Sequence, residues 1–268
     1  MTTVQSDQHS SSAGFYGAAT LKGGRDYQQD AYWLGEYVAI VADGMGGLPS
    51  GDLASRLAVD AAAEVIQAAE QRETAAIIAE AKAVGITLWR DPHEAVYEIK
   101  RAFSAAQEAL TKLITKGPYT SEFPATTLII VVRSVDGFVV GHLGDSRVYV
   151  ITAQAPEINR LAKKTTIRQV TSDHENTWGS ITRCVGGTNI LNPDKPDIEF
   201  VPTDKTFQQL LVATDGLFGY GFTDEAIRSL ADQSFSVTTP PVTAATFLVN
   251  EAFALGSQDN ITVVVGRA

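Results

Sequence analysis

The chain has 268 residues and a formal net charge of −10. Its hydrophobic fraction of 44% and charged fraction of 19% are those of a globular protein and exclude wholesale disorder. The negative charge argues against nucleic acid and anionic membranes as partners. No apolar run approaches the roughly 20 residues that span a bilayer.

Residues 1–13 are polar and rich in serine, which predicts a disordered N-terminal tail without a secretion signal. Residues 14–268 contain no linker rich in proline, glycine or serine, so we expect one domain there. Cys184 is the only cysteine, which excludes an internal disulfide and fits a reducing cytoplasm.

Apolar periodicity predicts the first elements after the tail. Residues 15–21 and 37–42 have the pattern of strands, and residues 51–69 that of a helix with one apolar stripe facing the core. The stripe consists of Leu53, Ala54, Leu57, Ala58, Ala61, Val65 and Ile66. Residues 92–114 predict a second long helix. The alanine-rich segment 70–91 is either a helix extension or a loop, and it is a candidate insertion.

The second half of the chain is rich in expected strands. Residues 127–133, 137–143 and 147–152 predict a meander of antiparallel strands. Further strands are predicted at 166–171, 209–214 and 261–265, the last one central, and helices at 224–230 and 242–254. Strands outnumber helices and follow one another directly, which predicts an α+β fold with antiparallel sheets.

Two stretches share one pattern, in which a buried strand runs into an Asp-Gly pair, at Asp43 and at Asp215. A lone Asp-Gly pair more often makes only a turn. Asp43, however, is followed by glycine-rich sequence around Met45, which lets a backbone carbonyl approach an ion closely.

Three more aspartates lie at expected strand ends or turns: Asp30, Asp145 and Asp259. Carboxylates without a histidine and cysteine set suit hard cations such as Mg²⁺ or Mn²⁺. Spacing along the chain does not show whether these side chains meet.

Eight motifs resemble, in order and wording, those of the metal-dependent type 2C Ser/Thr protein phosphatases, especially the bacterial members. They are RDYQQD at 25–30, VADGMGG at 41–47, ATTL at 125–128, GDSRVY at 144–149, QVTSDH at 169–174, ITR at 181–183, ATDGL at 213–217 and GSQDNITV at 256–263. The resemblance extends from residue 14 to the end of the chain. It implies an αββα fold, a β-sandwich of two antiparallel sheets flanked by helices.

The same resemblance implies a binuclear Mn²⁺ or Mg²⁺ centre. Asp43 would bridge the two metals, Gly44 would offer its carbonyl to one of them, and Asp215 and Asp259 would bind the other. Asp30 would act through metal-bound waters. Two such cations lower the pKa of a bridging water, which then attacks the phosphorus in line.

Two further residues gain roles from the resemblance. Asp145, with Asp215, matches the position of a weaker third metal in bacterial members. Arg25 matches the residue that clamps the substrate phosphate, and a guanidinium suits two phosphate oxygens.

The expected function is hydrolysis of phosphoserine and phosphothreonine on proteins by a metal-activated water. The substrate would be the target or product of a Ser/Thr kinase, and we expect a cytoplasmic monomer. Two alternatives remain: a pseudophosphatase or regulatory binding module with the same fold, and a two-metal hydrolase of small phosphoesters. Retention of Asp43, Asp215 and Asp259 favours an enzyme over the binding module.

The chain departs from the family pattern in two places. Met45 stands where eukaryotic relatives have a histidine that is a candidate general acid. Only residues 175–180 lie where bacterial members insert a flap subdomain, so part of the surface that recognises a protein substrate is missing. Of the remaining candidates, His142 is expected to be a core or rim residue, His174 to fix a loop, and Cys184 to be a structural thiol.

Overall fold

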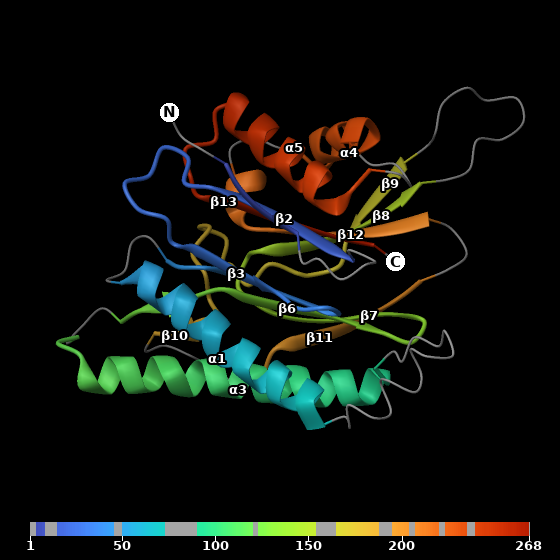
Figure 1. Cartoon of the computed structure of the whole chain (residues 1–268). Coiled ribbons are helices and arrows are strands. Elements are labelled where there is room, and N and C mark those ends of the chain that lie inside the picture. The colour runs from blue at the N-terminus through green and yellow to red at the C-terminus, as the bar shows by residue number, and fades with distance from the viewer. Residues whose placement is uncertain are drawn as a thin grey trace, which may run out of the picture.

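The computed structural model describes residues 4–8, 15–45, 50–72, 90–119, 123–153, 165–187, 195–203, 207–219, 223–234 and 239–267. They form two antiparallel β-sheets packed face to face, with a pair of helices on the outer face of each sheet (Figure 1). The αββα sandwich and the α+β fold class expected from the sequence are confirmed. Within the described ranges, no helix is long and apolar enough to cross a bilayer.

Six strands form the upper sheet in Figure 1. In spatial order they are β1 (Gln5–Gln8), β2 (Tyr16–Leu21), β13 (Ile261–Arg267), β12 (Phe207–Ala213), β8 (Arg147–Ala153) and β9 (Thr165–Gln169). β13 is central as predicted, and it is buried on both faces. Val263 and Val265 pack toward the helices, whereas Val264 packs toward the second sheet.

Five strands form the lower sheet, in the order β11 (Asp197–Pro202), β7 (Gly137–Leu143), β6 (Leu128–Ser134), β4 (Val38–Asp43) and β3 (Asp30–Leu34). In β6, Ile129 and Val131 point into the layer between the sheets, and Ile130 and Val132 point toward the helices. A small separate ladder joins β5 (Ala125–Thr126) to β10 (Val185–Gly186).

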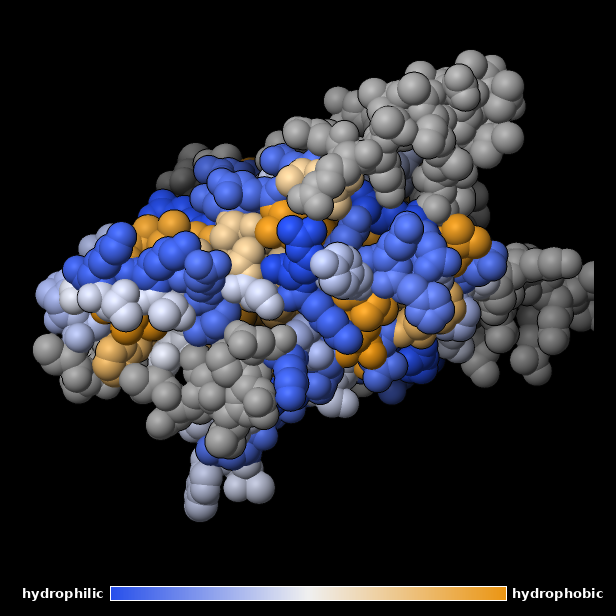
Figure 2. All heavy atoms as spheres, turned by 90° about the horizontal axis from the view of Figure 1, so that it is seen from below, coloured by the Kyte–Doolittle hydropathy of each residue, from blue (hydrophilic) through white to orange (hydrophobic). Residues whose placement is uncertain are grey.

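Helices α1 (Gly51–Arg72) and α3 (Pro92–Lys116) cover the five-stranded sheet, and α4 (Asp224–Ser234) and α5 (Pro241–Ala254) cover the other (Figure 1). α3 begins where predicted, since Asp91 accepts a hydrogen bond from the His93 N–H and caps the helix. On the face seen from below, apolar residues form separate spots among hydrophilic ones (Figure 2). Scattered spots of this kind are ordinary for a protein surface.

The predicted meander is wrong in its third strand. β6 and β7 pair with each other, but β8 pairs with β9 and β12 in the other sheet. The chain crosses between the sheets at Gly144, whose φ of 110° favours glycine. The crossing places Asp145 where strand ends of both sheets meet.

Five strands of the described residues were not predicted from the sequence: β1, β3, β5, β10 and β11. β1 lies inside the predicted disordered tail and pairs with the edge of β2, because backbone pairing tolerates its polar side chains. β11 is largely exposed, and β3 has a short continuous apolar run at residues 31–34 without the alternation of a half-buried strand. β5 and β10 have two residues each, which is too short for any period.

The buried face of α1 also differs from the predicted apolar stripe. Ala54 and Ala58 are buried as expected, but Leu57 is only partly buried, whereas Val59 and Ala62 are buried. The buried face is shifted because α1 packs against α3 as well as against the sheet. Residues 70–72 extend α1, and residues 73–89 of the candidate insertion lie outside the described residues.

Candidate metal centre

Strand ends from both sheets meet at one end of the sandwich around a cleft of about 590 Å³. β4 ends in Asp43, the crossing from β7 to β8 carries Asp145, Asp215 follows β12, and Asp259 precedes β13. Six of the seven predicted site residues line this cleft: Arg25, Asp43, Gly44, Asp145, Asp215 and Asp259. Antiparallel pairing therefore brings together carboxylates that are far apart in sequence.

The seventh predicted residue, Asp30, lies behind the cleft lining. It stands directly opposite Asp43 in the β3–β4 ladder and is 8% exposed. Its Oδ2 accepts a hydrogen bond of 2.9 Å from the Thr214 hydroxyl. Its Oδ1 is buried without a hydrogen-bond partner among the described residues. A buried carboxylate oxygen with spare acceptor capacity is suited to a cation or to water bound to one.

The carboxyl groups of the cleft are crowded, and their pKa values rise. Burial raises the pKa of Asp30 to about 7, and the negative charge of Asp215 adds to the shift. Burial and the charge of Asp30 raise the pKa of Asp43 well above its usual range. The pKa of Asp145 rises to about 6 through burial and the charge of Asp215. Burial and the charge of Asp259 also raise the pKa of Asp215.

Asp43 is held in place through its backbone. Its N–H donates to the Thr127 hydroxyl at 2.9 Å, and its carbonyl accepts from the Thr126 hydroxyl at 2.8 Å. The Thr127 hydroxyl also shares a hydrogen bond of 2.8 Å with that of Ser146, next to Asp145. A buried polar network therefore joins the two strand ends that carry Asp43 and Asp145.

Gly44 fits a position that no side chain could occupy. A Cβ there would lie 2.0 Å from the Gly51 carbonyl oxygen and 2.8 Å from that of Gln29. The Gly44 N–H donates to the same Gln29 carbonyl at 3.0 Å. The close packing of backbone on backbone fixes the peptide that carries the Gly44 carbonyl.

Arg25 lies at the rim and pairs with Asp259 at 2.5 Å, with its side chain 44% exposed. The loop that carries Arg25 is tied down by Asn260, whose amide donates to the carbonyls of Lys22 and Tyr27. The Asn260 side-chain oxygen accepts from the Gln29 N–H at 2.8 Å. Arg25 thus lies on a braced loop, with its charge beside the carboxylates.

The residues present fit hard divalent cations. The candidate donors are carboxylate oxygens and one carbonyl, the ligand type that Mg²⁺ and Mn²⁺ prefer. Arg25 is the only cationic side chain among the described residues that line the cleft. One guanidinium does not offset four carboxylates, so bound cations would relieve the repulsion that raises their pKa values.

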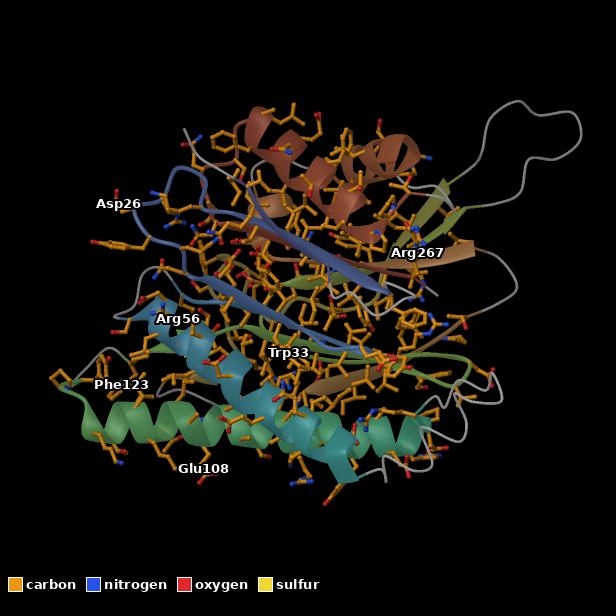
Figure 3. All side chains as sticks on the ribbon, viewed as in Figure 1. Asp26, Trp33, Arg56, Glu108, Phe123 and Arg267 are labelled. Atoms are coloured by element: carbon orange, nitrogen blue, oxygen red, sulfur yellow. The ribbon has the colours of Figure 1, made fainter. Side chains whose placement is uncertain are left out.

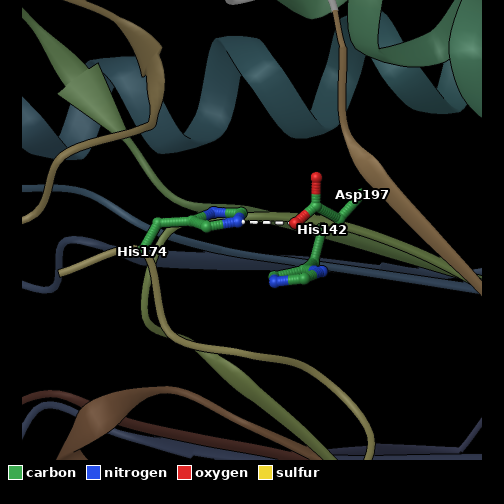
Figure 4. A group of neighbouring side chains, drawn as sticks. All are labelled: His142, His174 and Asp197. Carbon is green, nitrogen blue, oxygen red and sulfur yellow. Dashed lines mark hydrogen bonds and ion pairs between the residues drawn. The ribbon is translucent and has the colours of Figure 1, made fainter.

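A second group of possible ligands, His142, His174 and Asp197, is not part of the cleft lining. The two imidazole rings stack with centroids 4.6 Å apart and planes 7° apart (Figure 4). An ion binds imidazole in the plane of the ring, so two parallel stacked rings do not share one ion. The Arg183 guanidinium also contacts both His174 and Asp197, where its charge opposes a cation.

These side chains instead form a structural network. The Gly144 N–H donates to His174 Nδ1 at 3.0 Å, so His174 Nε2 carries the proton and donates to Asp197 at 3.0 Å. His142 is buried in β7. His174 therefore fixes the loop after β9, and His142 is a core residue, as the sequence predicts. Burial raises the pKa of the Cys184 thiol to about 11, which fits the expected structural thiol.

Sequence reasoning gave no role to several residues that shape the cleft: Gln29, Thr127, Ser146 and Asn260. Each lies next to an expected site residue or inside one of the eight motifs. That position in the sequence was the one feature that could have indicated a role at the site. Their roles depend on partners far along the chain, which adjacency does not reveal. Gly46 and Gly47 lie outside the described residues.

Comparisons with known proteins show which family and which fold this chain resembles. A family model described as protein phosphatase 2C matches residues 25–250. The serine/threonine phosphatase stp of Listeria welshimeri is 25% identical over 243 residues, covering 85% of this chain and 83% of that protein. The Mycobacterium tuberculosis serine/threonine phosphatase PstP/Ppp has a similar solved structure, with a TM-score of 0.67, 20% identity, and coverage of 94% of this chain and 97% of that one. A PstP catalytic domain in complex with two manganese ions gives a TM-score of 0.66 at 21% identity and covers 99% of each chain.

Proposed function

We propose that this chain, which belongs to the protein phosphatase 2C family, is a metal-dependent phosphatase that hydrolyses phosphoserine and phosphothreonine in proteins. One observation carries the proposal: four aspartates and one arginine from distant parts of the chain line a single cleft. A phosphate ester needs both positive charge and an activated water, and this cleft is suited to bind what supplies them. Residues 14–268 form the catalytic domain.

Asp43, Asp215, Asp259 and the Gly44 carbonyl would hold two cations, Mn²⁺ or Mg²⁺. Asp30 supports them from behind Asp43. When bound, the cations offset charge on the phosphoryl group and lower the pKa of water enough for it to attack phosphorus. Asp145 and Asp215 would hold a third, more weakly bound ion.

Arg25 orients the substrate. Its guanidinium is exposed at the rim and can donate to two phosphate oxygens while its loop stays braced by Asn260. The ion pair with Asp259 keeps the charge near the cleft before substrate arrives. Arg25 therefore selects for a phosphate group and fixes the direction in which phosphorus faces the carboxylates.

The described residues that line the cleft include no cysteine or histidine. The cleft therefore offers neither a thiol nor an imidazole that could form a phosphoryl intermediate or relay a proton. Met45 lies at the cleft in the position where eukaryotic relatives have a histidine, and its thioether cannot transfer a proton. With the aspartates assigned to the cations, water is the nucleophile in this proposal, and protons are transferred through solvent in the cleft.

The physiological substrate is a phosphoprotein modified by a Ser/Thr kinase, and the enzyme acts as a cytoplasmic monomer. The single cysteine and the acidic composition support the cytoplasmic assignment. The binding-module alternative is not favoured, because the full set of carboxylates is retained and gathered in one cleft. The small-phosphoester alternative is separated from the proposal by comparing substrates.

The experiment measures phosphate release from a phosphothreonine peptide and from p-nitrophenyl phosphate, in Mn²⁺ and in chelator. We expect hydrolysis of the peptide in Mn²⁺, loss in chelator, and loss with Asp215→Asn. Asp60→Asn, on the exposed face of α1, is the matched control and should leave the rate unchanged. Turnover of the aryl phosphate alone would contradict the assignment to proteins.

A further inference from the structure

A short hairpin at residues 174–182 borders the cleft at the point where bacterial members of the family insert a flap subdomain. Glu175 and Ile181 form its antiparallel bridge, and the Thr182 N–H donates to the His174 carbonyl at 2.7 Å. At the tip, the Asn176 side-chain oxygen accepts from the N–H groups of Trp178 and Ser180 at 2.9 and 3.0 Å. The tip is therefore a turn with several hydrogen bonds rather than a loose loop.

The hairpin is fastened to the metal centre. The Gly144 N–H donates to His174 Nδ1, and the His174 N–H donates to the Gly144 carbonyl at 3.0 Å. Gly144 directly precedes Asp145. On the far strand of the hairpin, Arg183 is bound to Asp197 at the start of β11. Both ends of the hairpin thus have fixed positions relative to the cleft.

Trp178 stands on this braced tip with 88% of its surface exposed, the largest value among the exposed large hydrophobic side chains of the described residues. A solvated indole gains nothing for the stability of the fold, whereas burial against a partner would be favourable. Because hydrogen bonds hold the hairpin tip, little backbone conformational entropy is lost when a partner covers the ring.

The indole is continuous with the cleft along the chain, because the next three residues, 179–181, line it. Across the cleft, Tyr27 is 75% exposed on the loop that carries Arg25. This loop joins β2 to β3 and projects at the left end of the sandwich, where Asp26 is labelled (Figure 3). Exposed aromatic residues thus belong to two of the segments that border the site where a phosphate would bind.

We propose that Trp178 is a specificity-determining residue that packs against an apolar side chain next to the phosphorylated residue of a protein substrate. The inference rests on the proposed function. Trp178 directly precedes Gly179, which lines the cleft, so the substrate residues close to the phosphorylated one are the candidates for this contact. Trp178 replaces, with one rigid contact, part of the recognition surface that a larger flap would offer.

The size of the expected change in affinity favours an apolar residue over a basic one next to the phosphorylated residue of the substrate. At this exposed tip a substrate cation keeps its water, so a cation over the ring changes affinity by about fivefold at most, whereas a well-packed interfacial tryptophan changes it by about five- to thirtyfold. Burial of the indole against an aliphatic side chain is therefore the stronger source of selectivity.

The test compares kcat/KM for three substrates of the Mn²⁺-loaded protein. They are a phosphothreonine peptide with leucine on both sides, the same peptide with serine there, and p-nitrophenyl phosphate. Trp178→Ala should lower kcat/KM for the leucine peptide about tenfold and leave the other two unchanged. Trp178→Phe should restore most of the loss. Tyr97→Ala, which removes an aromatic 64% exposed on α3, is the matched control and should change none of the three.

Equal losses on all three substrates would show that Trp178 only supports the fold of the site, and would overturn the inference. So would a Trp178→Ala variant that matches the control, or one whose loss is confined to a peptide with arginine beside the phosphothreonine. A wild-type protein that hydrolyses no phosphopeptide would contradict the proposed function instead. In that case calorimetry tests the contact between Trp178 and the substrate, with a peptide that has leucine on both sides of a non-hydrolysable phosphonate. Trp178→Ala should bind this peptide about tenfold more weakly than the wild type does. Equal affinity of the two proteins would overturn the inference.

Discussion

Asp30 and Asp43 stand directly opposite each other at the ends of β3 and β4, so two carboxyl groups share one corner of the protein. Side chains at opposed positions of an antiparallel ladder are neighbours, and like charges there repel. The fold holds this pair together although it gains nothing from it without a cation or a proton. The pair therefore lowers the stability of the metal-free protein and provides carboxylates for a metal ion.

The first prediction concerns the pH dependence of stability without metal. The pKa of Asp30 is about 7 in the folded protein and near 3.9 in the unfolded chain. Between these values the folded state binds more protons, so its stability falls as pH rises. Thermal unfolding in chelator should give a higher Tm at pH 5.5 than at pH 8.0, and saturating Mn²⁺ should raise the Tm most at pH 8.0.

Asp30→Asn is the control for this assignment, since it keeps the shape but removes the titrating charge. In chelator the variant should show a smaller Tm difference between pH 5.5 and pH 8.0 than the wild type. A wild-type Tm that rises with pH in chelator would show that the carboxyl pair does not titrate as stated.

The second prediction concerns the hydroxyl that holds Asp43. Thr127→Val keeps the side-chain shape but removes the acceptor for the Asp43 N–H and the partner of Ser146. Leaving a buried donor unsatisfied costs about 1–3 kcal/mol, and the looser strand end should bind Mn²⁺ more weakly. Denaturant unfolding and Mn²⁺ calorimetry measure the two effects. Thr111→Val, on the exposed face of α3, is the matched control; equal stability of the two variants would refute the role of Thr127.

The third prediction concerns Arg25. Arg25→Ala removes the guanidinium that lines the cleft, and loss of a charged hydrogen bond of about 1.5–3 kcal/mol lowers kcat/KM by about ten- to hundredfold. Arg25→Lys keeps the positive charge but loses the planar guanidinium that donates to two oxygens. Its kcat/KM should therefore lie between the values of the wild type and Arg25→Ala. Product inhibition by inorganic phosphate should weaken in parallel with the loss of activity. Unchanged phosphate inhibition in Arg25→Ala would place the phosphate elsewhere.

Much of the fold could be predicted from the sequence, because the patterns that indicate strands and helices are local. The apolar runs before Asp43 and Asp215 predicted β4 and β12, and the helical spacing predicted α1 and α3. β11 was missed because an exposed edge strand has no apolar period. The crossing at Gly144 was missed because Gly-Asp is equally good at closing a hairpin and at changing sheets.

The site was less predictable from physical patterns alone. Arg25 and Asp259 are in contact although 234 residues separate them, and nothing in their spacing implies this. The resemblance of eight motifs supplied that convergence, and the strand ends show how the fold produces it. The roles of Asn260 and Thr127 appeared only in the structure, since each acts through backbone groups that sequence does not pair.

The most direct measurement is a crystal structure of the protein soaked in Mn²⁺, with anomalous difference density collected to locate the ions. Our account predicts two peaks in the cleft, in contact with Asp43, Asp215 and Asp259, and their loss or weakening in Asp215→Asn. A cleft without anomalous density at millimolar Mn²⁺, or density only at His142, His174 and Asp197, would contradict it.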